Sequence, residues 1–574
     1  MYLFEIFRSF LPLRNTIGFG VADFLLLSMA LLLGALTFLR PWIETLGARL
    51  ARRTLWCMAA LALLPVALRL LLLWHHPVPF PDVYDEFGHL LEADTLRHFR
   101  FANPMHPMRE FFETYFALQE PSYSSIYPMG QGAALAIGWT LFGHPWAGVL
   151  LSLAAFCGLC FWMLRGWTTP GWALAGGCVA VCEFGPLSRW TNSYWGGFVP
   201  AIAGCLIFGA LPRLRAGGRR RDAILLGLGL SLHLLSRPYE TVFLAVAVAL
   251  YFALALRKPA EWRALARIAP AVALAVAPAL GITLLQNKQV TGSWTTLPEM
   301  AYQYQYGLPG TFTFQAPAEP HHALTPQQAM AYKMELSFRN GPESLPAFLE
   351  RLEYRVRYYR FFFYAPLYLA LPFFLMRLRE PRLLWVALAA LLLALGINFF
   401  PSFQLHYVAG ATCLFVLMSV AGLEGMSRLT VRGAPVGAQC AALLLMLCGA
   451  QFLFWYGMHV FDAGGVSATA QSFETWDSIN HANPERRLFV KRELDRVPGK
   501  LLVFVRYYPQ HVFQDEWVYN AADIDGARVV WARDLGAEKD QELLRYYPER
   551  TPLLLEPDFR PPRLSPYAAS PFER

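Results

Sequence analysis

Long apolar stretches, separated by short polar turns, follow one another through most of the chain. A helix needs about 20 mainly apolar residues to cross a lipid bilayer, and about a dozen stretches approach that length. They cover residues 21–39, 55–74, 146–164, 172–187, 196–211, 223–235, 239–256, 268–285, 361–376, 383–400, 406–423 and 436–456. The pattern predicts an α-helical polytopic membrane protein with about 12 transmembrane helices and additional interfacial helices.

The pattern changes after residue 458, where polar residues and charges of both signs become frequent. Short apolar runs then cover residues 501–505, 528–532 and 551–556, and a helix-like stretch covers residues 538–546. Apolar runs of this length around a helical segment favour a small soluble α/β domain with parallel strands. The predicted domains are a transmembrane domain of residues 1–458 and an exterior α/β domain of residues 459–574.

The composition agrees with a membrane protein, since 56% of the residues are hydrophobic and only 16% are charged. The net charge of +8 could suit nucleic acid, but the basic residues gather in short loops between apolar stretches. Such loops orient helices in a bilayer, so the bilayer is an expected partner and nucleic acid is not. Most of the nine cysteines lie inside apolar stretches, which predicts packing residues instead of disulfides or metal ligands.

Clusters of Lys and Arg indicate how the helices are oriented, because short cytoplasmic loops retain positive charge. All clusters fall on one side if the apolar run at residues 132–142 lies along the membrane surface instead of crossing it. The exterior then receives the loops at residues 77–143 and 287–360 together with the α/β domain. The side of the N-terminus stays open, since the first apolar stretch can cross or can form an interfacial hairpin. The basic clusters lie at residues 40–53, 213–221, 257–267, 377–382 and 428–432.

The first exterior loop carries an acidic segment, YDEFGHLLE at residues 84–92. If this segment is a helix, Asp85, His89 and Glu92 share one face and apolar residues line another. Such a helix could hold a carboxylate over a lipid-borne substrate at the membrane surface. An amphipathic surface helix that carries acids only for solubility is an equally good interpretation.

Other exterior turns bring polar residues to a similar depth. A charged residue at the end of a membrane helix is costly unless it pairs, reaches water or acts in function. For Arg237 and Glu240 the sequence therefore favours a structural pair and a phosphate-binding site about equally. His406 by itself is more typical of an interfacial packing residue than of a catalyst. The polar residues of these turns are Asn192 and Tyr194, Arg237 and Glu240, and His406 and Tyr407.

Several segments of the chain resemble the GT-C glycosyltransferases. The resemblance is closest to bacterial members related to the protein O-mannosyltransferase and aminoarabinose transferase group, which are similar to glycosyltransferase family 39. It covers most of the chain, including the α/β domain. The segments that carry it are YDEFGHLLEADTLRHFRFANPMHP, IYPMGQG, TNSYWGG, SRPYE and LHY, followed by LVFVRYYPQH, EWVYNAADID and VVWARD.

This resemblance implies transfer of a sugar from a polyprenyl-phosphate donor to an acceptor hydroxyl or amine, with inversion at the anomeric carbon. Asp85 would be the general base, and Glu86 would position it or contact the acceptor. Arg237 would stabilise the leaving phosphate, with His406 as a second candidate. The resemblance also implies a multi-pass protein of the bacterial inner membrane with its active site on the periplasmic side. The remaining predicted substrate-binding residues are His89, Tyr127, Asn192, Tyr194, Glu240 and Tyr407.

Two positions depart from the family pattern. Ile126 precedes the Tyr-Pro element where the aminoarabinose transferases place a lysine, and Asn192 stands where the superfamily often carries a second acid. No metal ligand is assigned for this reason, and a divalent cation stays an open alternative. The identity of the acceptor as a glycan, a lipid or a protein also stays open.

A membrane transporter or a lipid flippase is the main alternative, since it would share the helices and the loop charges. Transporters usually place ionisable residues near the middle of discontinuous helices. This chain keeps its acids and arginines mainly at the exterior ends of its apolar stretches. A membrane scaffold without catalytic activity is a third interpretation, and it leaves the acidic segment and the polar turns without a shared purpose.

Overall fold

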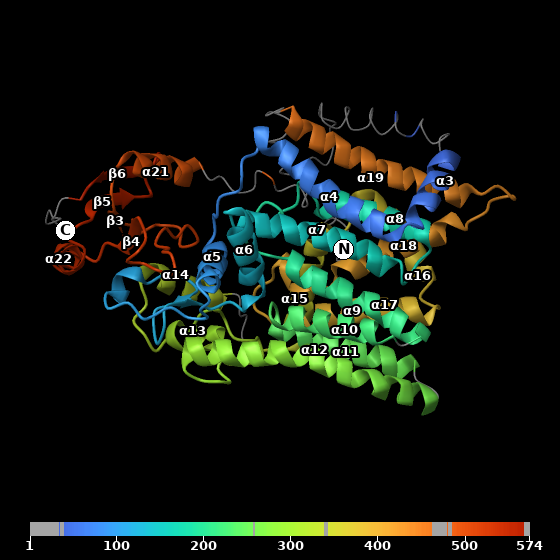
Figure 1. Ribbon diagram of the computed structural model, residues 1–574, viewed down its shortest axis with the longest axis horizontal. Coiled ribbons are helices and arrows are strands. Elements are labelled where there is room, and N and C mark those ends of the chain that lie inside the picture. Colours follow the sequence, from blue (N-terminus) through green and yellow to red (C-terminus); the bar gives the residue numbers. More distant parts are fainter. Residues whose placement is uncertain are drawn as a thin grey trace.

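The computed structural model describes residues 32, 34 and 40–567, except 218, 256–258, 338–341, 462–478 and 480–484. The chain is a multi-pass helical membrane protein with a small C-terminal α/β module (Figure 1). Its first helices are α3 (Arg40–Ala51), α4 (Thr54–Leu71), α5 (Tyr84–Arg97), α6 (Met129–Phe142), α7 (Trp146–Leu164), α8 (Pro170–Phe184), α9 (Phe198–Gly217) and α10 (Arg220–Leu234). They are followed by α11 (Pro238–Ala255), α12 (Pro259–Thr291), α13 (Pro298–Tyr306), α14 (Pro326–Ser337), α15 (Leu345–Val356), α16 (Leu371–Met376), α17 (Pro381–Ile397), α18 (Thr412–Ser427) and α19 (Val436–Val460).

Short 3-10 helices and one small ribbon complete this part. The 3-10 helices are η2 (Leu72–Trp74), η3 (Arg109–Phe112), η4 (Arg357–Phe362), η5 (Ala365–Leu369) and η6 (Leu405–Ala411). The strands β1 (Ala117–Leu118) and β2 (Ser124–Ser125) form an antiparallel pair in the first exterior loop.

Within the described residues, six helical stretches are long and apolar enough to cross a membrane. Three shorter apolar helices, α8, α11 and α17, add to them. All of these helices coincide with stretches that the hydrophobic pattern predicted, which confirms the fold class. A helix suits this environment because it satisfies every backbone polar group internally. The six stretches are Thr54–Trp74, Trp146–Leu164, Phe198–Gly217, Leu265–Thr291, Leu405–Ser427 and Val436–Val460.

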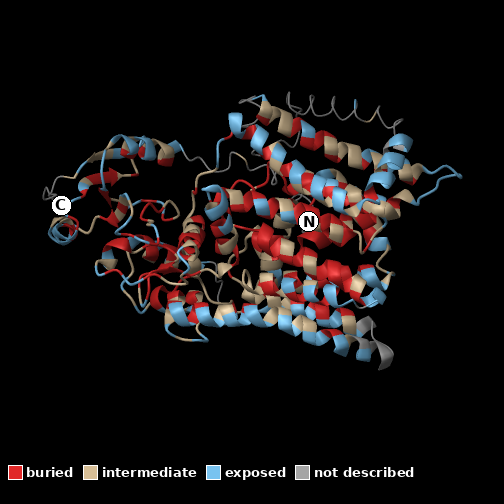
Figure 2. Ribbon diagram, viewed as in Figure 1, coloured by how far each residue is buried: buried red, intermediate tan, exposed pale blue. Residues whose placement is uncertain are grey.

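Burial separates the inner helices of the bundle from the outer ones (Figure 2). The most apolar windows of α7, α9 and η6–α18 are 67%, 72% and 89% buried, whereas that of α12 is only 11% buried. An apolar surface of this extent is unfavourable in water and favourable against lipid chains. The outer faces of helices such as α12 and α4 are therefore the lipid-facing surface.

One predicted stretch lies almost wholly outside the described residues, and another is not a straight span. Residues 21–39 lie outside the described residues apart from Leu32 and Gly34. The stretch at residues 361–376 is broken, because the helical segments Leu345–Phe362 and Ala365–Met376 meet at an angle of 113°. Proline stands at the start of both η5 and α16, where it cannot continue the hydrogen bonding of a preceding helix. The prediction of a continuous span there was wrong.

Helices α5 and α6 run across the direction of the long helices, at the end of the bundle nearest the C-terminal module (Figure 1). This arrangement agrees with the prediction that residues 132–142 lie along the surface.

Glycines allow α6 to pack closely against α7. A Cβ atom on Gly138 would lie 1.9 Å from the backbone nitrogen of Gly148, so no larger residue fits there.

The basic loops gather at the opposite end of the bundle. Figure 1 shows helix α3 and the connections α16–α17 and α18–α19 at the end farthest from the C-terminal module. Arg213 and Arg382 also lie there, where they donate to the backbone carbonyls of Trp162 and Trp167 at the end of α7. The separation of basic loops from exterior loops is therefore a feature of the fold, and the side of the membrane that each end faces stays a prediction.

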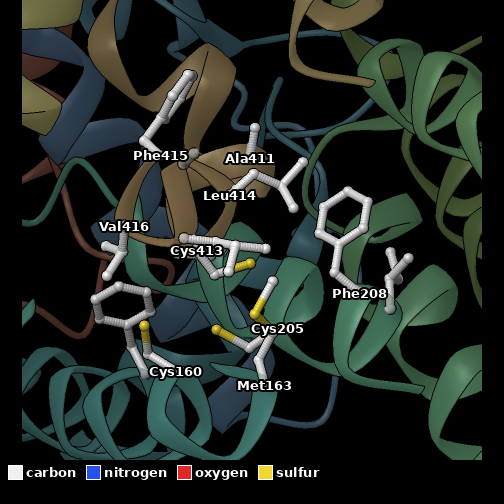
Figure 3. Close-up of a cluster of buried hydrophobic side chains, with 14 of the residues drawn as sticks. Cys160, Met163, Cys205, Phe208, Ala411, Cys413, Leu414, Phe415 and Val416 are labelled. Atoms are coloured by element: carbon white, nitrogen blue, oxygen red, sulfur yellow. The ribbon is translucent and has the colours of Figure 1, made fainter. Parts of the chain in front are cut away.

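The centre of the bundle is packed with apolar side chains and thiols (Figure 3). Cys160 of α7, Cys205 of α9 and Cys413 of α18 come together in this core, and none of them is exposed. All nine cysteines are free, and six of them are buried, whereas Cys178 and Cys440 are exposed.

The C-terminal module is built on a sheet with the strand order β4-β3-β5-β6. The central strand β3 (Leu501–Val505) pairs in parallel with β4 (Val529–Arg533) and with β5 (Thr551–Glu556). Strand β6 (Arg563–Pro566) is antiparallel to β5. Helices α21 (Glu485–Arg496) and α22 (Ala537–Tyr546) complete the module. The prediction of parallel strands with a helix before β5 is confirmed.

Candidate active site

A cavity of about 880 Å³ lies where exterior helices meet the ends of α10, α11 and α12. Its wall also includes residues of α5, α13 and α15 and of the turn that precedes η6. The fold thus joins side chains that are far apart in the sequence. The predicted site residues that line the cavity are Asp85, His89, Tyr127, Arg237, Glu240, His406 and Tyr407.

Helix α5 begins beside the cavity, and Glu86 caps its first turn. One carboxylate oxygen of Glu86 accepts hydrogen bonds from the backbone N–H groups of Asp82 and Val83, at 2.8 and 3.2 Å. The other oxygen accepts from the backbone N–H of Tyr194, at 2.8 Å. A carboxylate at this helical position satisfies donors that the helix leaves free. Glu86 therefore fastens the start of α5 to the turn around Tyr194.

Asp85 precedes Glu86 and points into the cavity. Its carboxylate accepts a hydrogen bond from the phenol of Tyr127. Burial raises the pKa of Asp85 to about 6, against the opposing effects of Tyr127, Trp195 and Arg237. A carboxylate with a pKa near neutrality is ionised at pH 7 and is still basic enough to accept a proton. Asp85 is the side chain of α5 best suited to general base catalysis.

His89 lies one turn further along α5 and also lines the cavity. Its ring centroid is 4.2 Å from that of Tyr127, and its Nδ1 atom has no hydrogen-bond partner among the described residues. Burial lowers the pKa of His89 to about 3, so the imidazole is neutral at pH 7. A neutral imidazole can donate and accept hydrogen bonds, which suits contact with a sugar hydroxyl.

Arg237 is the predicted phosphate-binding residue, and it lies at the junction of α10 and α11. Its Nη1 atom is 3.7 Å from Oε1 of Glu240, and its guanidinium lies 4.7 Å from the ring centroid of Tyr407. The Arg237 side chain is 24% exposed, whereas Glu240 is almost fully buried. The two residues form a long ion pair at the cavity wall, and the arginine keeps access to the cavity.

His406 and Tyr407 come from η6 and approach the same region. The ring centroid of His406 is 5.3 Å from that of Trp195 and 5.0 Å from that of Tyr407. His406 is buried but contributes to the cavity wall. Aromatic surfaces with polar edges suit the apolar faces and the hydroxyls of a sugar.

Three predicted site residues do not line the cavity. Asn192 accepts a hydrogen bond from Nε of Arg69 at 2.8 Å, and its amide donates to backbone carbonyls of the same turn. The phenol of Tyr194 donates to the carbonyl of Pro79 at 2.8 Å. Glu86 is occupied by backbone donors, as described above. These hydrogen bonds hold the turn and α5 in place, and a role of these residues in substrate binding stays a prediction.

Residues that were not predicted from the sequence also line the cavity. Arg351 and Arg355 lie one turn apart on α15, and both line the cavity together with Glu299 of α13. Arg351 pairs with Glu343 at 2.7 Å, while Arg355 donates to the backbone carbonyls of Ile397, the last residue of α17, and Pro401. The spacing of these arginines on an amphipathic stretch was a signal that could have identified them.

Across the part of the chain that the structure describes, no group of three or more His, Cys, Asp or Glu side chains is placed to hold a metal ion.

No protein-family model matches the sequence, and no curated protein matches it either. Among solved structures, the fold is similar to that of ArnT from Cupriavidus metallidurans, both in the apo state and bound to undecaprenyl phosphate. In each case the TM-score is 0.48 and the identity is 12%, over 86% of this chain and 92% of that chain. The apo form of an oligosaccharyltransferase from Archaeoglobus fulgidus is also similar, with a TM-score of 0.44 and 12% identity over 79% of this chain and 62% of that chain.

Proposed function

We propose that this protein is an inverting glycosyltransferase that moves a sugar from a polyprenyl-phosphate donor to an acceptor on the periplasmic face of a bacterial inner membrane. The observation that carries the proposal is the shared cavity of Asp85 and Arg237 at the exterior end of the membrane helices. One side chain can accept a proton there, and the other can receive a phosphate. Their place beside the ends of the apolar helices α10, α11 and α12 suits a donor whose sugar is attached to a lipid.

The reaction needs one displacement at the anomeric carbon. Asp85 takes the proton of the acceptor hydroxyl or amine while the acceptor atom bonds to that carbon. The bond from the anomeric carbon to the phosphate oxygen breaks on the opposite face, and the phosphate keeps the electron pair. A single displacement of this kind inverts the configuration.

Arg237 stabilises the negative charge that grows on the departing phosphate. A guanidinium matches a phosphate well because it offers several N–H donors in one plane. The long contact of Arg237 with Glu240 leaves donors available, and His406 is a second candidate for this contact. His89, Tyr127 and Tyr407 line the same cavity and are proposed to bind the sugar.

The proposal is tested with protein reconstituted in liposomes that contain a synthetic undecaprenyl-phosphate hexose. Envelope extract supplies the acceptors, and the release of undecaprenyl phosphate is measured together with the mass of new glycosylated products. We expect Asp85→Asn to lower turnover about 100- to 10,000-fold, the usual range for loss of a general base. The matched control is Asp82→Asn, which makes the same change three residues earlier, outside the cavity.

Equal turnover by the Asp85→Asn variant and the unchanged protein would rule out Asp85 as the base. Movement of a solute or a lipid across the bilayer without any glycosylated product would favour the transporter or flippase alternative. Comparison of cellular glycans with and without the protein by mass spectrometry identifies the acceptor.

A further inference from the structure

Helix α5 packs against the C-terminal module as well as against α6 (Figure 1). Phe87, two residues after Asp85, stacks on Tyr519 of the module with ring centroids 4.3 Å apart and planes only 4° apart. The guanidinium of Arg487, on α21, lies 4.8 Å from the ring centroid of Phe87. The first turn of α5 is thus held between an aromatic ring and a cation of the module.

A second contact fixes the other end of the same helix. Oδ2 of Asp94, in the last turns of α5, accepts a hydrogen bond from the backbone N–H of Ala522 at 2.9 Å. Tyr123 of the first exterior loop donates to the backbone carbonyl of Asn520 at 3.0 Å. One short segment of the module, residues 519–522, therefore contacts α5 near both ends and the loop beside it.

The module also reaches the cavity itself. Gln514 lies in the loop between β3 and the segment at residues 519–522, and it forms part of the cavity wall. In the same loop, Glu516 pairs with Arg533 at 3.1 Å, and both residues are buried. The loop that carries these contacts is thus anchored within the module and does not extend freely over the cavity.

A general base acts well only when its carboxylate is held within a fraction of an ångström of the productive position. The cap by Glu86 fixes the start of α5 along the chain, but α5 also needs support on the side that faces away from α6. We propose that the C-terminal module is a positioning element of the active site, in which Tyr519 and Arg487 hold Phe87 and thereby place Asp85. This inference rests on the proposed role of Asp85.

A positioning role predicts a specific kinetic change. Replacing Tyr519 by Leu removes the stacked ring, so we expect the kcat for release of undecaprenyl phosphate from the synthetic donor to fall about 10- to 100-fold. The KM for this donor should change less than about twofold, since the donor-binding groups of the cavity stay in place. Tyr519→Phe keeps the ring and should retain nearly full turnover. The matched control is Tyr508→Leu, because Tyr508 is an exposed tyrosine of the module that contacts Phe559.

A double-mutant cycle tests the contact itself and does not depend on one variant. Phe87→Leu removes the same stack from the side of α5, so the double variant with Tyr519→Leu should have about the same kcat as either single variant. If Tyr519→Leu fails to fold, Phe87→Leu alone has to show the loss in kcat. Independent, multiplicative effects of the two substitutions would overturn the inference, as would equal turnover of Tyr519→Leu and Tyr508→Leu.

The two proposals can fail separately. An inactive Asp85→Asn variant with a fully active Tyr519→Leu variant would contradict the positioning role and leave the glycosyltransferase proposal standing. Full activity of the Asp85→Asn variant would overturn both.

Discussion

The charged side chains at the two ends of the helical bundle differ in how closely they are paired. At the end with the basic loops, Arg377 contacts Glu380 at 2.6 Å and Glu424 at 3.1 Å. Glu424 also pairs with Arg428, at 2.9 Å. At the cavity, Asp85 accepts its hydrogen bond from an uncharged phenol, and Arg237 is 3.7 Å from its nearest carboxylate. Close ion pairs hold the charges of the basic end, whereas at the cavity Asp85 and Arg237 lack a close partner of opposite charge, although Arg351 has one in Glu343.

This difference separates structural charges from candidate catalytic charges. The charges of the basic end have close partners of opposite sign, and the exposed pair of Arg428 with Glu424 contributes little to stability. A buried carboxylate without a close cation is costly, and the raised pKa of Asp85 reflects that cost. Such costs are often retained at sites that carry out chemistry. The comparison therefore predicts that substitutions at the cavity affect turnover, while those at the basic end do not.

After Asp85→Asn, the largest effect in this comparison is expected for Arg237→Ala. Removing the cation should lower kcat/KM about 100- to 1,000-fold, because negative charge on the leaving phosphate loses its stabilising donor. The variant should also bind undecaprenyl phosphate more weakly in a direct binding measurement. Arg237→Lys should restore part of the activity, since it keeps the charge and loses the planar set of donors. Unchanged affinity for the lipid phosphate would show that Arg237 is only the partner of Glu240.

Glu86→Ala should affect stability more than chemistry. The substitution leaves the backbone N–H groups of Asp82, Val83 and Tyr194 without their acceptor, and we expect it to lower the free energy of unfolding by about 2–4 kcal/mol. A thermal unfolding measurement in detergent, together with the remaining kcat of the folded fraction, checks this. A large loss of kcat with unchanged stability would instead favour direct contact of Glu86 with the acceptor.

Tyr127→Phe tests the hydrogen bond to Asp85 through the pH profile. Asp85 must be ionised to act as the base, so activity should fall as the pH drops through its pKa of about 6. The phenol of Tyr127 stabilises the ionised carboxylate, and its removal should raise the pKa of Asp85. The acid limb of the kcat/KM profile should therefore move to higher pH. The plateau value of kcat/KM at high pH should change less than the values on the acid limb. A shift to lower pH would contradict the assigned hydrogen bond.

The smallest effect is expected at the basic end, for Arg428→Ala. This arginine is mostly exposed and pairs with Glu424, so its loss should change the free energy of unfolding by less than about 1 kcal/mol. Turnover should stay within about twofold of the unchanged protein, because the pair lies far from the cavity. A strong loss of turnover here would remove the distinction between the two ends.

Local sequence was a good guide wherever one physical property dominates a whole segment. Long apolar stretches predicted the membrane helices because hydrocarbon requires both apolar side chains and internally bonded backbone. Short apolar runs predicted β3, β4 and β5 for a similar reason. The break at residues 361–376 was missed although Pro366 and Pro372 mark it, because overall apolarity outweighed the two prolines in the interpretation.

The site was only partly predictable. Helical spacing placed Asp85 and His89 on one face of α5, and both line the cavity. Asp85 and Glu86 are adjacent on the helix and point about 100° apart, and only Asp85 lines the cavity. Which one does so depends on the distant turn at Tyr194, whose backbone N–H binds Glu86. Likewise, Asn192 accepts a hydrogen bond from Arg69 of α4 and does not line the cavity.

The sequence by itself therefore determined the membrane helices, the parallel strands and the polar residues available at the exterior end, because these follow from the apolarity and spacing of neighbouring residues. Only the tertiary structure decided which polar residues face the cavity, that Arg351 and Arg355 join it, and that the C-terminal module holds α5. Those features depend on contacts between residues far apart in the chain. Each polar side chain has several local conformations of similar energy, and the packing of whole helices decides which one it adopts.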